Sequence, residues 1–288
     1  MELSRRRFAQ LAGTAAMAAP QLRGQQAPIT AQQVIERIQK NAGSAWLTES
    51  ADTVKAGDPS AIVTGIVTTA MATNAVLMRA TDEKANFVIT LEPTFFGRAD
   101  APLADDPVSA AKMDLIRKNG LVVFRFSDNW RTRRPDPFAI GLARALAWTK
   151  YQVGDDPTRY DLPGLTLGAL ADHLAKRLSA RAGIRVTGDP KTQVKRVGLL
   201  PGASTLAATM KALPACDAVV AGETREWESV EYAQDTVASG QKKGFLMIGR
   251  VMSQDPGMDV CAEWVKSLVP EVPVKWMPAG DPYWRPTL

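Results

Sequence analysis

The chain has 288 residues, of which 45% are apolar and 23% charged. This is the composition of a globular protein long enough to bury a substantial core, and it excludes a disordered chain, a fibrous repeat and a polytopic membrane protein. Two cysteines exclude a disulfide scaffold and a four-cysteine zinc module. Because His173 is the single histidine, any metal site rests mainly on oxygen ligands.

The formal net charge is +5, and the first eighteen residues contribute a net +2 of it, which leaves +3 for the rest. No later run of Lys and Arg alternates with aromatic residues, so we do not expect a nucleic-acid partner. The densest basic group is Arg131, Arg133 and Arg134. It is either a solvated loop or a loop that binds an anion.

The amino terminus is typical of an export signal. Residues 4–8, SRRRF, place a twin arginine ahead of a weakly apolar stretch at 11–18 that ends in the small-x-small cleavage pattern AMA. The apolar stretch is too short to span a bilayer. We therefore expect residues 1–26 to be an export signal and leader for the twin-arginine route, flexible as far as residue 30, and the mature protein to be periplasmic.

The rest of the chain alternates short apolar runs with stretches of helical periodicity. Strands are expected at Ile62–Thr69, Asn86–Thr90, Leu121–Phe126, Val194–Leu200, Asp217–Ala221, Gly244–Ile248 and Val272–Trp276. Helices are expected at Thr73–Glu83, Pro107–Asn119, Pro137–Trp148, Leu165–Ala182, Ser204–Leu213, Arg225–Ser239 and Met258–Leu268. His173 lies beside the leucine stripe of one helix and is expected to be partly exposed, without a chemical role.

This strand–helix alternation predicts an α/β protein whose mixed, mostly parallel sheets are flanked by helices. The stretch Asp155–Gly164 is rich in Asp and Pro, and it is the best candidate boundary. We expect two lobes, at 27–155 and 156–288.

Three of the expected strands run directly into an acid. In open α/β sheets, ligands bind beyond the carboxyl ends of the strands, and the acids there are Glu92, Asp128 and Glu223. Converging carboxylates repel unless a cation or a proton joins them, so the three form a candidate site for a hard metal ion. The alternative is that they lie on separate surface loops. No nucleophile elbow, P-loop, zinc-protease helix or nicotinamide fingerprint accompanies them.

The segments around these acids resemble one family in their order and spacing. They are Ile66–Ala80, Asn86–Phe96, Leu121–Trp130, Val197–Ser204, Asp217–Glu223 and Gly249–Gln254. Together they resemble the dinuclear-metal-centre proteins named for the Ngg-one interacting factor three, also known as GTP cyclohydrolase I type 2 homologues. The resemblance implies two α/β lobes with a metal site in the cleft between them, and a homo-oligomer, often a hexameric ring. It names no substrate, and the cyclohydrolase label does not transfer an activity.

The ligand positions that the resemblance implies are where this sequence departs from the family. Leu91 stands where the family has the first histidine of His-His-Pro or His-Glu-Pro, and the segment that holds Asp128 lacks the family's histidine. Arg250 and Gln254 stand in place of a histidine and a glutamate. Leu91 cannot bind a metal, and Arg250 is a permanent cation. We expect Arg250 to contact Glu92 or Asp128 in place of a metal bridge.

Three hypotheses of function follow, and the first is favoured. The protein is an exported member of this hydrolase-like family with a degenerate metal site, holding no metal or a weakly bound Mg²⁺, Mn²⁺ or Zn²⁺, and its small-molecule substrate is unknown. Alternatively it is an active hydrolase in which Glu92, Asp128 and Glu223 hold one Mg²⁺ or Mn²⁺, whose bound water attacks a phosphate or ring carbon. The third hypothesis is a non-catalytic binding or assembly protein. In each case we expect a homo-oligomer, no membrane span and no nucleic acid.

Overall fold

The structure is a computed structural model that describes residues 27–180, 183–284 and 286, so the expected export signal at 1–26 lies outside the described residues. The helices are α1 (Ala31–Lys40), α2 (Asn74–Asp82), α3 (Pro107–Lys118), α4 (Asp128–Thr132), α5 (Pro137–Ala145), α6 (Leu167–Arg177), α7 (Leu206–Ala215), α8 (Glu231–Ala238) and α9 (Arg250–Leu268), with a 3₁₀ turn η1 (Thr149–Tyr151) and a π turn η2 (Glu226–Val230). The strands are β1 (Val54–Ala56), β2 (Ile66–Thr69), β3 (Phe87–Thr90), β4 (Val122–Arg125), β5 (Gln152–Val153), β6 (Asp156–Thr166), β7 (Arg185–Thr187), β8 (Gln193–Ala203), β9 (Ala218–Glu223), β10 (Gly244–Met247) and β11 (Val274–Trp276).

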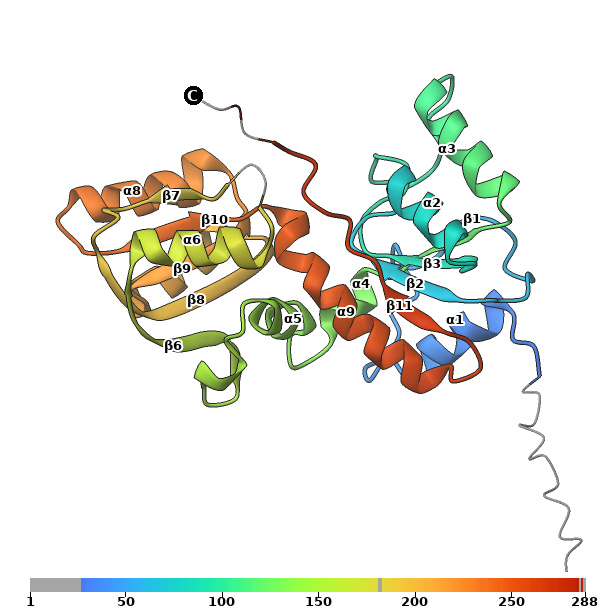
Figure 1. Cartoon of the computed structure of the whole chain (residues 1–288), viewed down its shortest axis with the longest axis horizontal. Helices are drawn as coiled ribbons and strands as arrows, with labels where there is room; N and C mark the ends of the chain where they lie inside the picture. The colour runs from blue at the N-terminus through green and yellow to red at the C-terminus, as the bar shows by residue number, and fades with distance from the viewer. Residues whose placement is uncertain (1–26, 181–182, 285, 287–288) are drawn as a thin grey trace, which may run out of the picture.

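The strands form two sheets, one in each of two lobes (Figure 1). The first sheet has the order β1-β4-β3-β2-β11, and all its pairs are parallel except β1 with β4. The second has the order β5-β6-β8-β9-β10-β7, with parallel pairs at β8-β9-β10. The α/β class with mixed, mostly parallel sheets is therefore confirmed.

Helix α9 runs between the two lobes (Figure 1). Its carboxyl half joins the core of the first lobe, where Met258, Cys261 and Val265 are buried with Phe87 and Phe124 of the sheet. Its amino-terminal end follows β10 of the second lobe. Since the carboxyl ends of neighbouring parallel strands meet at one edge of a sheet, the segments after β3, β4, β9 and β10 lie near this helix start.

The chain passes from one sheet to the other twice. Strand β5, at residues 152 and 153, already belongs to the second sheet, and β11 returns to the first sheet beside β2. Strand β6 covers most of the Asp155–Gly164 stretch, and the division into lobes at 27–155 and 156–288 stays a prediction. Pro163 falls where the β6–β8 register shifts, between Asp161 and Leu165, and a proline is tolerated in a strand at such an irregularity.

Two other expectations needed correction. The flexible leader does not extend to residue 30, because Ile29 is buried and Thr30 caps α1 through a capping box with Gln33. Helix α9 begins eight residues before the expected Met258. Separately, Cys216 and Cys261 are buried as free thiols in different core clusters.

His173 is half-buried in α6, as expected, and its ring stacks on Trp148 at a centroid distance of 6.0 Å. No helix in the described part of the chain combines the length and the apolar character that crossing a membrane requires.

Candidate functional site

Glu92 is the centre of the candidate site. It follows β3, and its side chain is only 12% exposed. Oε1 accepts hydrogen bonds from Arg131 Nη2 at 2.8 Å and from Arg250 Nε at 2.9 Å, and Oε2 accepts from Arg250 Nη2 at 3.1 Å. The expected contact of Arg250 is therefore present, and its partner is Glu92. Two guanidinium groups share one largely buried carboxylate, an arrangement in which charge assists each hydrogen bond.

Gln254 completes the network from the next turn of α9. The orientation of its amide is assigned from the hydrogen bonds that it makes. Its nitrogen donates to Glu92 Oε1 at 3.2 Å, and its oxygen accepts from Arg131 Nη1. Gln254 itself is buried, at 1% exposed. We name the set Glu92, Arg131, Arg250 and Gln254 the arginine–carboxylate network.

Arg131 was not singled out from the sequence, where it belonged to a basic group taken as a solvated or anion-binding loop. It lies in α4, one turn after Ser127, and its Nε donates to Ser127 Oγ at 3.3 Å. Burial lowers the pKa of Arg131 from its ordinary value, Glu92 opposes this shift, and the nearby Arg250 charge adds to it. The group nevertheless stays charged, because a guanidinium does not lose its proton in proteins. No helix was predicted at Asp128–Thr132, so this role was not predicted from the sequence.

The other two arginines of that basic group lie elsewhere. Arg133 places its guanidinium 4.4 Å from the ring centroid of Trp264 and 5.3 Å from that of Trp130, and its Nη1 donates to the Ala42 carbonyl at 2.9 Å. It therefore packs against the core of the first lobe. Arg134 is exposed.

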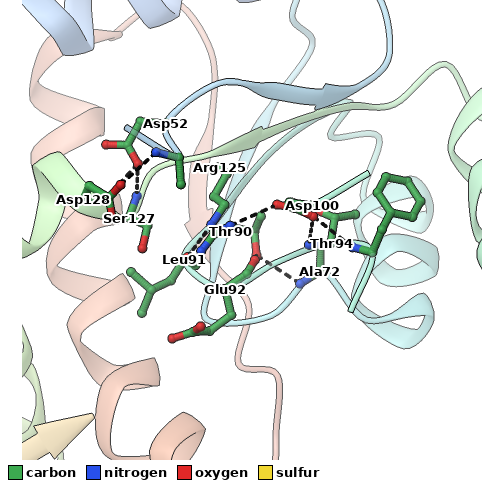
Figure 2. Close-up of polar contacts among 12 residues, drawn as sticks. Asp52, Ala72, Thr90, Leu91, Glu92, Thr94, Asp100, Arg125, Ser127 and Asp128 are labelled. Carbon is green, nitrogen blue, oxygen red and sulfur yellow. Dashed lines mark hydrogen bonds and ion pairs between the residues drawn. The ribbon is translucent and has the colours of Figure 1, made fainter. Parts of the chain in front are cut away.

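Asp128 is held on a separate set of contacts. Its Oδ2 accepts from the Ala51 amide at 2.7 Å. The amides of Ser127, Asp128 and Asn129 donate to the buried carboxylate of Asp52 at 2.6, 2.9 and 2.8 Å. Asp52 thus fixes the start of α4, and with it the direction in which Arg131 reaches Glu92. Figure 2 shows this group, with dashed lines from Asp52 to Ser127 and Asp128.

Behind Glu92, a buried cluster fixes the loop that carries it. Asp100 Oδ1 accepts from the amides of Thr94 and Phe95 at 2.5 and 2.9 Å, and Lys112 Nζ donates to the Thr94 carbonyl at 2.7 Å. Arg125 lies 3.6 Å from Asp100. In Figure 2 the Glu92 carboxylate points away from this cluster, so the cluster supports the loop and leaves the carboxylate to the arginines.

Glu223 lies at the outer side of the network. It is the last residue of β9, its side chain is 58% exposed, and Oε2 is 3.8 Å from Arg250 Nη1. Arg250 therefore connects two of the three predicted acids, whereas Asp128 is bound to the Ala51 amide. The assignment of Glu92, Asp128 and Glu223 as metal ligands stays a prediction.

The residues present do not fit the metal centre that the family resemblance implies. Leu91 is fully buried among apolar side chains, and both Glu92 oxygens are engaged by guanidinium groups. Within residues 27–180, 183–284 and 286, no three His, Cys, Asp or Glu side chains are grouped so that they would hold a metal ion. A divalent cation at this point would have to displace two permanent positive charges from Glu92.

The comparison with known proteins decides the family. The family model described as Duf34/NIF3 (NGG1p interacting factor 3) matches residues 29–241, most of the chain. The chain belongs to the Duf34/NIF3 family. No curated protein matches it.

Solved Duf34/NIF3-like structures share the fold. Protein SA1388 of Staphylococcus aureus has a TM-score of 0.68 at 13% identity, over 90% of this chain and 100% of that one. A Bacillus cereus protein related to NIF3 has a TM-score of 0.65 at 13% identity, over 89% and 99%. Protein ybgI, of unknown function, has a TM-score of 0.67 at 19% identity, over 88% and 100%. Identities this low establish the fold alone.

Proposed function

We propose that the protein is an exported member of the Duf34/NIF3 family in which the arginine–carboxylate network replaces the dinuclear metal centre. One observation carries the proposal. Glu92, the carboxylate best placed to ligate a metal, accepts three hydrogen bonds from Arg131 and Arg250. A guanidinium supplies the positive charge of a metal without its open coordination positions, so the proposal includes no metal-bound water.

The first test of this proposal is metal content. Protein purified without a histidine tag is analysed for bound metals and then titrated calorimetrically with Mn²⁺ and with Zn²⁺. We expect far less than one metal per chain and no tight binding. Near-stoichiometric metal in the unaltered protein would overturn the proposal and favour the hydrolase in which Glu92, Asp128 and Glu223 hold Mg²⁺ or Mn²⁺.

A second test restores ligands. The triple variant Leu91→His, Arg250→His and Gln254→Glu removes the charge of Arg250 and adds three ligand groups, so its affinity for Mn²⁺ or Zn²⁺ should rise well above that of the unaltered protein. The control is Arg250→His alone, which should gain little, because Leu91 and Gln254 still supply no ligand. Equal affinities of the triple variant and the unaltered protein would show that these positions do not surround a metal site.

The export part of the proposal rests on the sequence of residues 4–8. Residues 1–30 are fused to a reporter that functions only in the periplasm. We expect export by the twin-arginine route, and its loss when Arg5 and Arg6 are both changed to Lys, because that route reads the arginine pair. Unchanged export of the double variant would make the assignment wrong.

A further inference from the structure

Arg250 has hydrogen-bond donors that the network does not use. A guanidinium carries five N–H groups. Arg250 Nε and Nη2 donate hydrogen bonds to Glu92. Nη1 makes no hydrogen bond to any residue that the structure describes, and its contact is the ion pair with Glu223 at 3.8 Å, which is longer than a hydrogen bond. The Arg250 side chain is 37% exposed, so solvent reaches part of it.

Arg131 offers no comparable opening. All three of its nitrogens have partners: Nε contacts Ser127, Nη2 contacts Glu92 and Nη1 contacts Gln254. Among the described residues, Arg250 Nη1 is therefore the guanidinium nitrogen of the network that has no hydrogen-bond partner, and it lies on the side of Glu223.

The charges in this region are balanced between the two arginines and their two acids. Glu92, at 12% exposed, is fixed between the two arginines, whereas Glu223 is 58% exposed and makes no side-chain hydrogen bond to a described residue. An exposed ion pair at this distance contributes about 0–1 kcal/mol. A ligand that brings its own carboxylate would keep the charge balance and would gain the hydrogen bond that Glu223 does not make.

We propose that Arg250 Nη1 is the docking point for a small molecule bearing a carboxylate, and that the Glu223 side chain occupies this point as an internal mimic of the ligand. The inference rests on the proposed function, because it requires a site held by arginines and not by metal ions. It names the substrate or ligand class of the same site. Binding displaces Glu223 toward solvent and leaves the Glu92 contacts in place.

The test uses glutarate, which carries the same terminal carboxylate as a glutamate side chain. The arginine Nε–H signals of the ¹⁵N-labelled mature protein are followed by NMR during titration, with NaCl at matched ionic strength as the reference. The signal of Arg250 is identified by its loss in Arg250→Lys. We expect glutarate, and not NaCl, to shift this signal to saturation.

Two substitutions of exposed acids separate mimicry from a general charge effect. Glu223→Gln removes the competing carboxylate and should lower the dissociation constant for glutarate about fivefold, the effect of one exposed ion pair. The matched control is Glu226→Gln, which changes another exposed acid three residues away that pairs with Arg185 at 2.7 Å, and it should leave the dissociation constant unchanged. The proposal would be overturned if both variants lowered the dissociation constant for glutarate equally, or if neither variant lowered it.

The remaining measurements test whether another anion binds in place of a carboxylate, and they separate failure of this inference from failure of the proposed function. Saturation by inorganic phosphate without saturation by glutarate would overturn the carboxylate assignment. A glutarate response that disappears after treatment with a chelator would place the ligand on a metal, and would overturn both this inference and the proposed function. A metal-free protein with no glutarate response, in Glu223→Gln as well, would overturn this inference alone.

Discussion

The change Glu92→Gln removes the carboxylate that Arg131 and Arg250 share. Three hydrogen bonds from guanidinium groups end on it, and its side chain is 12% exposed. Removing one partner of a buried ion pair costs about 3–5 kcal/mol, and an exposed pair contributes about 0–1 kcal/mol. Arg131 and Arg250 are 32% and 37% exposed, so the pairs lie between these limits. We expect Glu92→Gln to lower the free energy of unfolding by about 2–4 kcal/mol.

The assay is urea unfolding, followed both by tryptophan fluorescence and by circular dichroism. Trp130 and Trp264 lie in or against the core that includes α9, so their fluorescence follows the first lobe. The control is Glu226→Gln, which removes the same charge from an exposed pair with Arg185 and should cost less than about 1 kcal/mol. A loss within about 0.5 kcal/mol of zero for Glu92→Gln, the range of ordinary surface changes, would refute the reasoning that the network is a buried counter-charge system.

Three further predictions concern Lys112, Gly222 and the assembly. Burial lowers the pKa of Lys112 to about 8 from 10.5, with Asp100 opposing the shift. Between these pH values the unfolded chain therefore holds a proton that the folded chain has lost, and stability rises with pH. In urea unfolding, the free energy of unfolding of the unaltered protein should rise between pH 8 and pH 10.5 by about 1–3 kcal/mol more than that of Lys112→Met. The control is the exposed residue Lys118: the free energy of unfolding of Lys118→Met should change with pH as it does in the unaltered protein. Gly222→Ala should lower the melting temperature, because a Cβ there meets the Gly202 carbonyl and Ser253 Oγ, whereas Gly164→Ala has open space and should not. Light scattering on the mature protein at micromolar concentration should show a homo-oligomer, as the family resemblance implies, and a monomer would contradict this.

Most of the fold could be predicted from the sequence, because short apolar strands alternate with helices whose apolar residues recur at helical spacing. Among the elements that were not predicted, α1 and β6 were missed for local reasons. The signal for α1 was present in the Thr30–Gln33 capping box and the apolar positions Val34 and Ile38, but it adjoined the expected leader. The Asp- and Pro-containing sequence of β6 is more typical of a linker, and its pairing with β8 is a tertiary contact that local sequence does not encode.

The candidate site was readable in part. Arg250 and Glu92 lie 158 residues apart, and the family resemblance, together with the rule that strand ends converge, predicted their contact. The role of Arg131 depends on the Asp52 carboxylate, which fixes α4 from a distant part of the chain. No spacing within the sequence reveals that partner. The same limit applies to the separation of Asp128 from Glu223, because Asp128 accepts a hydrogen bond from the distant Ala51 amide and Glu223 lies beside Arg250.

The position of β11 has a consequence for how the protein is made. The first sheet is finished by the last strand of the chain, which pairs with β2 about two hundred residues earlier in synthesis. A ribosome therefore releases all the strands of the second lobe before it supplies the strand that closes the first, and the partly made first lobe presents β2 as an open parallel edge. A chain that stops at residue 241, where the family match ends, also lacks β10, α9 and both arginine–carboxylate contacts of Arg250. Such a truncated chain should be recognised by chaperones and proteases as unfinished.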